Sequence, residues 1–403
     1  MKKYLIVGVA LAMVLVACGD DTGTTTTAGG TETTAGATDT TAGATDTTAG
    51  ATDTTAAAAG GMEELIAAAQ EEGTLTTIAL PHDWCGYGDV IQGFKDAYGL
   101  EVNELDPGAG SAEELEAVDA NRDNPGPQAP DVLDIGLAFG PQAKEQGLIQ
   151  PYMVSTWDEI PEDAKDPEGY WYGDYYGVLS LEVNTSAVSE LPAEYADLLE
   201  PAYNGQVALS GDPLTSNAAI LSVWAAGLAT GASGEEAAQA GLDFFAELNA
   251  AGNFVPIDGD SRTVGIGETP ILIDWSYNSI ANDVNLAGNP DIETIVPEAG
   301  RIAGVYVQAI SAFAPHPNAA KLWMEYLYSD EGQLGWASAF CHPIRFEAMS
   351  AAGTIPAEIS EQLPSTEGAF FPSIEEIEAA SAVIVEGWPS VVGVTVEPSP
   401  SGG

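Results

Sequence analysis

The chain has 403 residues, of which 45% are hydrophobic, so it is long enough for two domains with substantial cores. Its 61 acidic residues outnumber its 10 basic residues, which gives a formal net charge of −51. Because binding to a phosphate backbone needs clustered Lys and Arg, this charge argues against nucleic acid as a partner.

The first residues read as an export signal that ends in a lipid-modified cysteine. Lys2 and Lys3 precede an apolar run that is shorter than the ~20 residues a membrane span needs. The run ends in LVAC, at Cys18, which resembles a bacterial lipobox. We therefore expect residues 1–17 to be a removed signal peptide and Cys18 to carry a lipid. An ordinary signal peptide with a chance cysteine is the alternative.

Residues 18–61 have the composition of a tether. Beyond Cys18 they contain no Lys, no Arg and no large apolar residue, and TTAGATD repeats at 33–39, 40–46 and 47–53. Such a segment cannot bury enough surface to offset its chain entropy, so we expect it to be disordered.

The first half of the folded part alternates helices and strands. A helix is predicted over 62–73 and ends at Gly73. The elements predicted after it are strand 74–80, loop 81–88, helix 89–100, strand 101–105, a Gly-rich turn and helix over 106–118, apolar strand 130–139 and helix 140–148. This order indicates an α/β fold with a parallel sheet, in which loops at the strand C-termini form the ligand crevice.

The second half continues the alternation. Its predicted strands are 177–188, the start of 205–217, the start of 270–284, and 301–314. Its predicted helices are 218–229, 235–252, the end of 270–284, 317–340 and 373–388.

Several stretches together resemble the substrate-binding lipoproteins of bacterial ABC importers, in the branch for iron, thiamine, polyamines and phosphosugars. They are AAAQEEGTLTTIAL, GVLSLEVNTSAV, HPNAAKLWMEYLYSDEGQ and CHPIRF, within residues 62–346. The resemblance implies a periplasmic-binding-protein type II fold: two α/β lobes, each a mostly parallel sheet with flanking helices, with a ligand cleft between them.

The resemblance also implies how the chain is divided and what it does. Lobe 1 would comprise 62–178 and 305–345, and the crossover with lobe 2 would comprise 179–304. Residues 346–403 would pack on lobe 2 and the hinge. The protein would be an exported monomer without a cofactor, lipid-anchored on the outer face of the cytoplasmic membrane. It would hand a small-molecule solute to an ABC permease, and closure of hinged lobes around that solute would present it.

Residues from both lobes are expected to face the ligand. In the loop PHDWCGYG of lobe 1, these are His82, Asp83, Trp84 and Tyr87. The remaining candidates are Ser111, Tyr176, Ser216, Asn217, Asp274, Trp275, Tyr277 and Tyr306. Ser216 and Asn217 open a helix, where free backbone amides hold polar or anionic groups. The alternative for the aromatic candidates is ordinary packing over the sheet ends.

Two cysteines remain if Cys18 is lipidated. An exported domain matures under oxidising conditions, so Cys85 and Cys341 are expected to form a disulfide. The alternative is a zinc site built from these two cysteines with His82 and His342, a common ligand set in an uncommon spacing.

The acids and aromatics among the candidates favour an organic cation, such as a polyamine or thiamine, as the solute. Ferric iron is the alternative, but the adjacent tyrosines Tyr175 and Tyr176 fall in lobe 1 rather than lobe 2. A phosphorylated or anionic solute would use Arg262, Arg301 or Arg345.

Two other protein classes compete with a solute-binding protein. A secreted hydrolase would be an enzyme, but the sequence has neither a G-x-S-x-G nor an H-E-x-x-H motif. A structural surface lipoprotein would show no closure upon binding a solute.

Overall fold

The computed structural model describes residues 51–399, with side chains from residue 61 onward. The predicted signal peptide, Cys18 and most of the predicted tether lie outside this part of the chain. Helix α1 (Ala51–Glu72) begins within the segment predicted to be a tether, where the sequence carries a run of alanines, the strongest helix formers. Among the described helices, none combines the length and the apolar character needed to cross a membrane.

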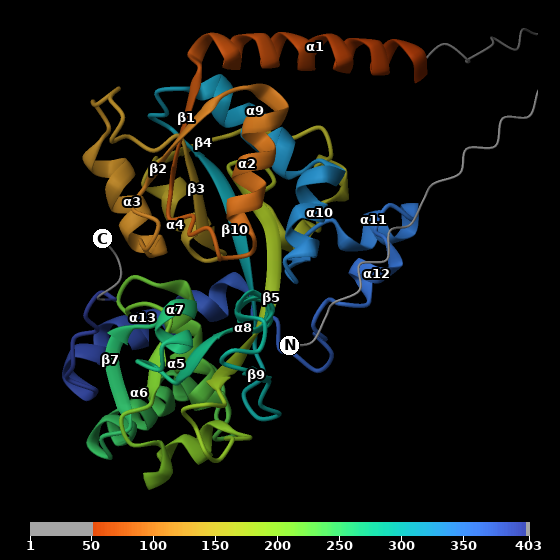
Figure 1. Ribbon diagram of the computed structural model, residues 1–403. Helices are drawn as coiled ribbons and strands as arrows, with labels where there is room; N and C mark the ends of the chain where they lie inside the picture. The colour runs from red at the N-terminus through yellow and green to blue at the C-terminus, as the bar shows by residue number, and fades with distance from the viewer. Residues whose placement is uncertain (1–50, 400–403) are drawn as a thin grey trace, which may run out of the picture. The chain divides into compact units, whose positions relative to one another are not determined.

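The first lobe consists of two sheets with helices packed around them (Figure 1). Its strands are β1 (Thr74–Ile78), β2 (Glu101–Leu105), β3 (Val132–Gly136), β4 (Ile149–Gln150), β10 (Ala303–Ser311) and β11 (His342–Pro343). Its helices are α2 (Tyr87–Tyr98), α3 (Ser111–Ala120), α4 (Phe139–Glu145), α9 (Pro317–Leu327) and α10 (Asp330–Ser338). β1 and β2 pair in parallel, whereas β10 runs antiparallel to β3.

The second lobe, from the middle of the chain, has one sheet with helices packed around it. Its strands are β6 (Val207–Leu209), β7 (Phe254–Asp258), β8 (Ile271–Trp275) and β9 (Ile292–Ile295). Its helices are α5 (Asn217–Leu228), α6 (Gly234–Ala250), α7 (Ser261–Gly265) and α8 (Ser276–Leu286). β6 pairs in parallel with both β7 and β8, so their carboxyl ends lie at one edge.

Strand β5 (Trp171–Asn184) connects the two lobes (Figure 1). Its residues up to Val178 pair with β10, and its residues from Leu179 pair with β8 and β9, all antiparallel. The antiparallel pairings of the larger sheet therefore arise where β5 and β10 carry the chain between lobes.

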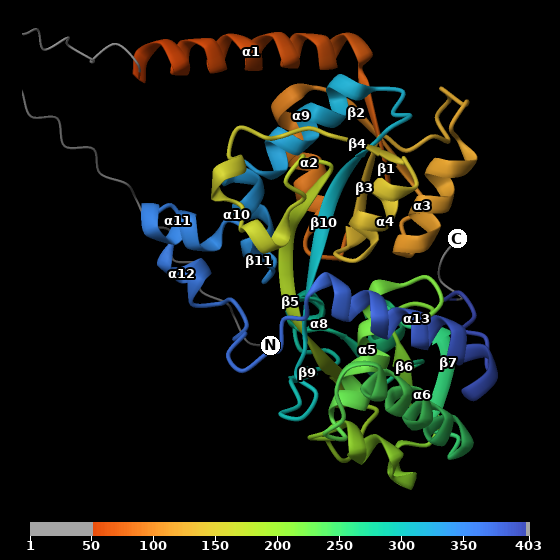
Figure 2. The same cartoon turned by 180° about the vertical axis from the view of Figure 1, so that it is seen from behind.

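The C-terminal part begins with two short helices, α11 (Phe346–Ala352) and α12 (Ala357–Ser360). It ends with the long helix α13 (Ile374–Val391), which packs against α6 and α5 of the second lobe (Figure 2). Ile377, Ile384 and Trp388 on α13 are buried there, at the helical spacing that produces one apolar face.

Candidate functional site

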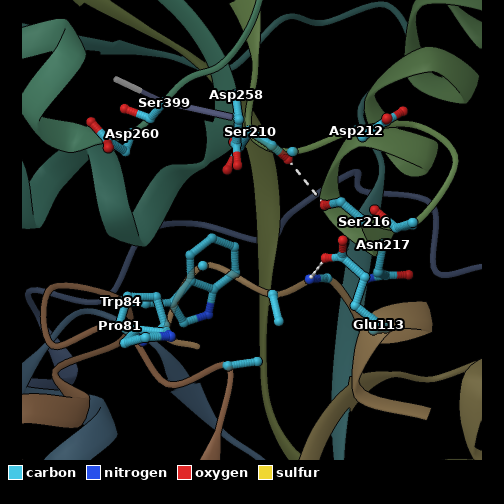
Figure 3. A pocket seen from close by; sticks show the side chains of 18 of the residues that line it. Pro81, Trp84, Glu113, Ser210, Asp212, Ser216, Asn217, Asp258, Asp260 and Ser399 are labelled. Carbon is cyan, nitrogen blue, oxygen red and sulfur yellow. Dashed lines mark hydrogen bonds between the residues drawn. The ribbon is translucent and has the colours of Figure 1, made fainter. Parts of the chain in front are cut away.

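A cavity of about 910 Å³ lies between the two lobes and is lined from both of them. The first lobe contributes the β1–α2 loop, the β2–α3 turn, the start of α3 and Asp134 of β3. The second lobe contributes the β6–α5 and β7–α7 turns and the junction of β8 with α8. Most of these segments follow the C-terminal end of a strand, which is where α/β sheets bind ligands. In Figure 3, Asp258 and Asp260 lie on the side opposite Pro81 and Trp84.

Acidic side chains dominate the lining of this cavity. Among the described residues, nine acidic side chains line it, against a single basic side chain, Arg262, which is itself exposed. The nine are Asp83, Asp106, Glu113, Glu114, Asp134, Asp212, Asp258, Asp260 and Asp274. Within a cleft of low-dielectric walls, one sign of charge focuses the field and concentrates ligands of the opposite sign.

Two aromatic rings, Trp84 and Tyr306, belong to the apolar part of the lining. Their centroids are 5.8 Å apart in an edge-to-face arrangement. The indole Nε1 of Trp84 donates to the hydroxyl of Tyr175 at 2.9 Å, which fixes the orientation of the Trp84 ring. Ring faces held in this way attract cations.

Two of the carboxyls that the second lobe presents to the cavity, Asp258 and Asp274, are hard to ionise. Burial, with repulsion from Asp260, raises the pKa of Asp258 to about 7. Burial raises the pKa of Asp274 to about 6, although the Asn278 amide donates to its Oδ2. Behind the cavity wall, burial raises the pKa of Glu182 to about 8, with repulsion from Asp274 adding to the effect. A positive charge in the cavity would favour ionisation of all three groups.

A second group of buried acids lies in the first lobe. Burial raises the pKa of both Asp134 and Asp174. The Tyr175 hydroxyl donates to Asp134 Oδ2 at 2.8 Å, and the Gln308 amide donates to Asp174 Oδ2 at 2.9 Å. Gln308 also donates to the hydroxyl of Tyr87 at 2.9 Å. These hydrogen bonds hold the buried side chains behind Asp134, the residue of this group that lines the cavity.

The two lobes touch directly beside the cavity. The amide of Ala112, in the first turn of α3, donates to the carbonyl oxygen of Thr215 in the second lobe at 3.1 Å. Gly110 makes this approach possible, because a Cβ atom there would lie 2.8 Å from the same oxygen. The structure therefore has its lobes closed against each other.

Seven of the residues predicted to face the ligand line the cavity, and the structure brings them together from both lobes. They are Asp83, Trp84, Ser111, Ser216, Asn217, Asp274 and Tyr306. Asp274 Oδ1 and Asn217 Nδ2 are buried there without a hydrogen-bond partner. The Ser216 hydroxyl caps α5 by accepting from the Ala219 amide.

The other five predicted residues do not line the cavity. His82 points to solvent and pairs with Glu104 at 2.6 Å. Tyr87 is fully buried in the first lobe. Tyr176 stacks on His342, because alternation along β5 sends it to the face opposite Tyr175.

Trp275 and Tyr277 lie beneath the cavity wall rather than in it. They stack on each other at 6.1 Å, and Trp275 is fully buried. Trp275 Nε1 donates to the Tyr306 hydroxyl at 3.3 Å, so it supports a lining residue from behind. Trp275 and Tyr277 therefore take the positions that the alternative predicts, namely ordinary packing over the end of the sheet.

Sequence reasoning missed most of the acidic lining. Asp258 ends β7 and Asp260 follows it, in the sequence PIDGD, and an acidic turn at the end of a strand was the available signal. Asp134 is a charged residue inside the otherwise apolar stretch VLDIG, which also marks it as unusual. Three lining residues, Val396, Pro398 and Ser399, come from the C-terminal tail, and no sequence signal pointed to them.

Cys85 and Cys341 form the predicted disulfide, with their Cα atoms 5.8 Å apart. The bond ties the loop that carries Trp84 to the chain just after α10. It also removes both sulfur ligands from the alternative zinc set. Within residues 51–399, no group of three His, Cys, Asp or Glu side chains is arranged to hold a metal ion.

Comparison with known proteins agrees with this architecture. The model of a family described as bacterial extracellular solute-binding protein matches residues 128–376. An uncharacterized protein of Haemophilus influenzae is 30% identical over 265 residues, which are 60% of this chain and 70% of that protein. Iron uptake protein A2 of Synechocystis sp. is 28% identical over 258 residues, covering 59% of this chain and 69% of that protein.

A solved structure shows the same fold. The periplasmic binding protein AfuA from Actinobacillus pleuropneumoniae, with exogenous fructose-6-phosphate bound, matches with a TM-score of 0.59 at 19% identity. The match covers 80% of this chain and 98% of that one. The predicted two-lobe α/β fold is confirmed.

Proposed function

The chain belongs to the bacterial extracellular solute-binding proteins, and on that premise we propose that its cavity binds an organic cation, either a polyamine or a thiamine-like compound. Proteins of this family bind small solutes for import by ABC transporters and are not enzymes. The chemistry of the cavity is what supports one solute class over the others.

The charge of the lining carries the proposal. Nine carboxylates face the cavity and only Arg262 opposes them. A carboxylate and an ammonium group 4 Å apart attract each other by roughly 4 kcal/mol at the effective dielectric near a protein surface. An anionic solute would meet repulsion from the ionised carboxylates instead, and burial next to an anion would keep the other carboxyls neutral.

The carboxylates are spread over the wall rather than gathered at one point. Asp258 interacts electrostatically with Asp260, Asp274 and Glu113, and Asp274 also interacts with Asp83, so these acids form one connected set that comes from both lobes. A wall with several acids along it suits a solute with several amines along one chain. Trp84 and Tyr306 add aromatic faces for the cation or for its alkyl part.

The alternatives have less support in the cavity. Ferric iron would need several hard ligands converging on one point, and the described residues provide no such group of three His, Cys, Asp or Glu side chains. A phosphorylated solute would depend on Arg262 and on the start of α5, with nine carboxylates nearby. The name of the Synechocystis relative refers to iron uptake by that protein.

We also propose that Cys18 carries a lipid that anchors the exported protein to the outer face of the cytoplasmic membrane, where it meets its permease as a monomer. The support is the LVAC sequence that precedes the Thr-rich segment. Mass spectrometry of the mature N-terminus tests this. A chain that begins at Cys18 with an added diacylglycerol is expected, and an unmodified N-terminus contradicts it.

Two measurements test the solute. Small molecules released by denaturing the freshly purified protein are identified by mass spectrometry. The emptied protein is then titrated with spermidine, putrescine, thiamine, inorganic phosphate, fructose 6-phosphate and ferric citrate while its Tm is followed. We expect the amines to raise Tm. A rise with only the anions or ferric citrate overturns the proposal.

A further inference from the structure

The tail after α13 is held in place along its described length. We call residues 392–399 the C-terminal strap. Gly393 turns the chain with φ of 72°, and the indole Nε1 of Trp388 donates to the carbonyl oxygen of Val394 at 3.0 Å. Val396 is 5% exposed and belongs to the hydrophobic core. The strap is therefore packed onto the second lobe.

The strap also pairs with the edge of the second lobe's sheet. The strands of the larger sheet follow the order β3-β10-β5-β8-β6-β7, so β7 is an edge strand with a neighbouring strand of this order on one side alone. Glu397 takes that side: its amide donates to the Pro256 carbonyl at 3.0 Å, and its carbonyl accepts from the Asp258 amide at 2.8 Å. Two ladder hydrogen bonds place the strap beside the residue whose carboxyl lines the cavity.

Beyond this pairing, the strap reaches the cavity itself. Val396, Pro398 and Ser399 are all lining residues. In Figure 3, Ser399 lies beside Asp258 and Asp260, on the side of the cavity opposite Pro81 and Trp84. The family model matches residues 128–376, so the strap lies outside the part of the chain that it describes.

We propose that the C-terminal strap is a wall of the solute site, in which Val396 and Pro398 contact the apolar segment of the solute and slow its release. The chemical class of the solute rests on the proposed function, but the wall itself does not. Val396 and Pro398 place apolar surface next to the carboxylates of Asp258 and Asp260. An alkyl segment between two charged amines fits this alternation of apolar and acidic surface.

The wall is tested first without any solute. A single reactive thiol is introduced as Ser210→Cys in a Cys18→Ser background, because Ser210 lines the cavity and is only 9% exposed. One variant ends after Thr395 and lacks the lining part of the strap. The matched control ends after Ser399 and keeps it. The rate of maleimide modification is measured for both and for the full chain.

We expect the variant that ends after Thr395 to react about tenfold faster, because shielding by the strap sets how often the thiol is accessible. The control should react like the full chain. Equal rates in all three proteins overturn the proposal. Where circular dichroism shows that the shortened chain fails to fold, Glu397→Pro replaces it, since proline has no amide hydrogen to donate to Pro256. The same increase is then expected, and an unchanged rate overturns the proposal.

Spermidine is the probe for the second measurement, by stopped-flow dissociation. The shortened chain should release spermidine about tenfold faster than the control, with a smaller change in the association rate. Equal release rates contradict the contact with Val396 and Pro398. If spermidine binds neither protein, the proposed polyamine class fails, while the maleimide rates still decide whether the strap is a wall.

Discussion

Trp84 and Tyr175 are joined by a hydrogen bond of 2.9 Å between the indole Nε1 and the phenol oxygen. The phenol in turn donates to Asp134 Oδ2 at 2.8 Å. Tyr175 does not itself line the cavity. Its hydroxyl nevertheless fixes the orientation of Trp84 and donates a hydrogen bond to Asp134, and both of these residues line the cavity. The position of the Trp84 ring therefore depends on a residue that the solute does not touch.

Tyr175→Phe should weaken both the fold and the solute site. The change removes both hydrogen bonds, so that Asp134 Oδ2 loses its Tyr175 partner in a buried carboxyl whose Oδ1 already has none. We expect the free energy of unfolding to fall by about 1–3 kcal/mol, measured by denaturant titration. Spermidine affinity should fall as well, because the Trp84 ring loses its fixed orientation.

Tyr195→Phe is the matched control for that change. Tyr195 is equally buried, but its hydroxyl has no hydrogen-bond partner. Its removal should leave stability unchanged or slightly higher. An equal loss in the two variants would mean that the Trp84–Tyr175–Asp134 chain contributes nothing specific.

Glu113→Gln should weaken the binding of a cation. Glu113 lines the cavity, and the substitution removes its charge while keeping an oxygen that can accept from the Gly110 amide, as Glu113 does at 2.7 Å. Loss of one carboxylate near the solute should raise the Kd for spermidine about tenfold at low salt, and less at high salt because salt screens the interaction.

Glu116→Gln changes the net charge by the same amount on the same helix. Glu116 is exposed and does not line the cavity, so calorimetry should find its Kd close to that of the unchanged protein. If both variants weaken spermidine binding equally, the effect comes from the overall charge of the protein and not from the cavity.

Gly110→Ala should prevent the lobes from closing as the structure shows them. The new Cβ atom would lie 2.8 Å from the carbonyl oxygen of Thr215, and a backbone atom cannot move aside like the end of a side chain. We expect weaker solute binding and, in small-angle scattering, no compaction when spermidine is added.

Gly108→Ala is the control on the same turn, since a Cβ atom there would meet nothing within 4 Å. It should close and bind normally. Normal compaction of the Gly110→Ala variant would show that the contact between Ala112 and Thr215 is not needed for the closed form.

The ligand-free protein should lose stability as pH rises. Burial raises the pKa of Asp274 to about 6, of Asp258 to about 7 and of Glu182 to about 8, above the values in an unfolded chain. The neutral carboxyls therefore stabilise the fold fully below about pH 4, and this contribution is lost as pH rises through about 6 to 8. Tm should fall between about pH 5 and about pH 8.

Bound spermidine should flatten this pH dependence, because a nearby positive charge favours the ionised carboxyls. Binding should then release protons, which calorimetry in buffers of different ionisation enthalpy detects, and affinity should rise with pH. Asp258→Asn should reduce the slope of Tm against pH, whereas Glu116→Gln should not. A Tm that rises toward pH 8 in the ligand-free protein contradicts the prediction.

The two-lobe fold could be predicted from the sequence because its signals are local. Strands, helices and their order follow from apolar periodicity and from Gly and Pro positions. The disulfide could also be predicted, because two cysteines remained in an exported domain. The antiparallel pairings of β5 could not be read in this way, since they depend on which distant strands become its neighbours.

Individual site residues were harder to predict, because a loop's position does not fix the direction of each side chain. Asp274 lines the cavity, but the next residue, Trp275, points behind it, as alternation along a strand requires. Asp83 and Trp84 line the cavity, whereas their neighbour His82 turns toward Glu104. The lining by Val396 and Pro398 depends on long-range packing of α13, which leaves no local pattern.

The pairing of Glu397 with β7 has a practical consequence for anyone who handles this protein. Ser399 lines the cavity, so an affinity tag or a surface linker attached directly after it would begin at the cavity wall. Such an attachment would interfere with a sensor that relies on the cavity. For the same reason, a fluorophore coupled near this end would be well placed to report when the cavity fills.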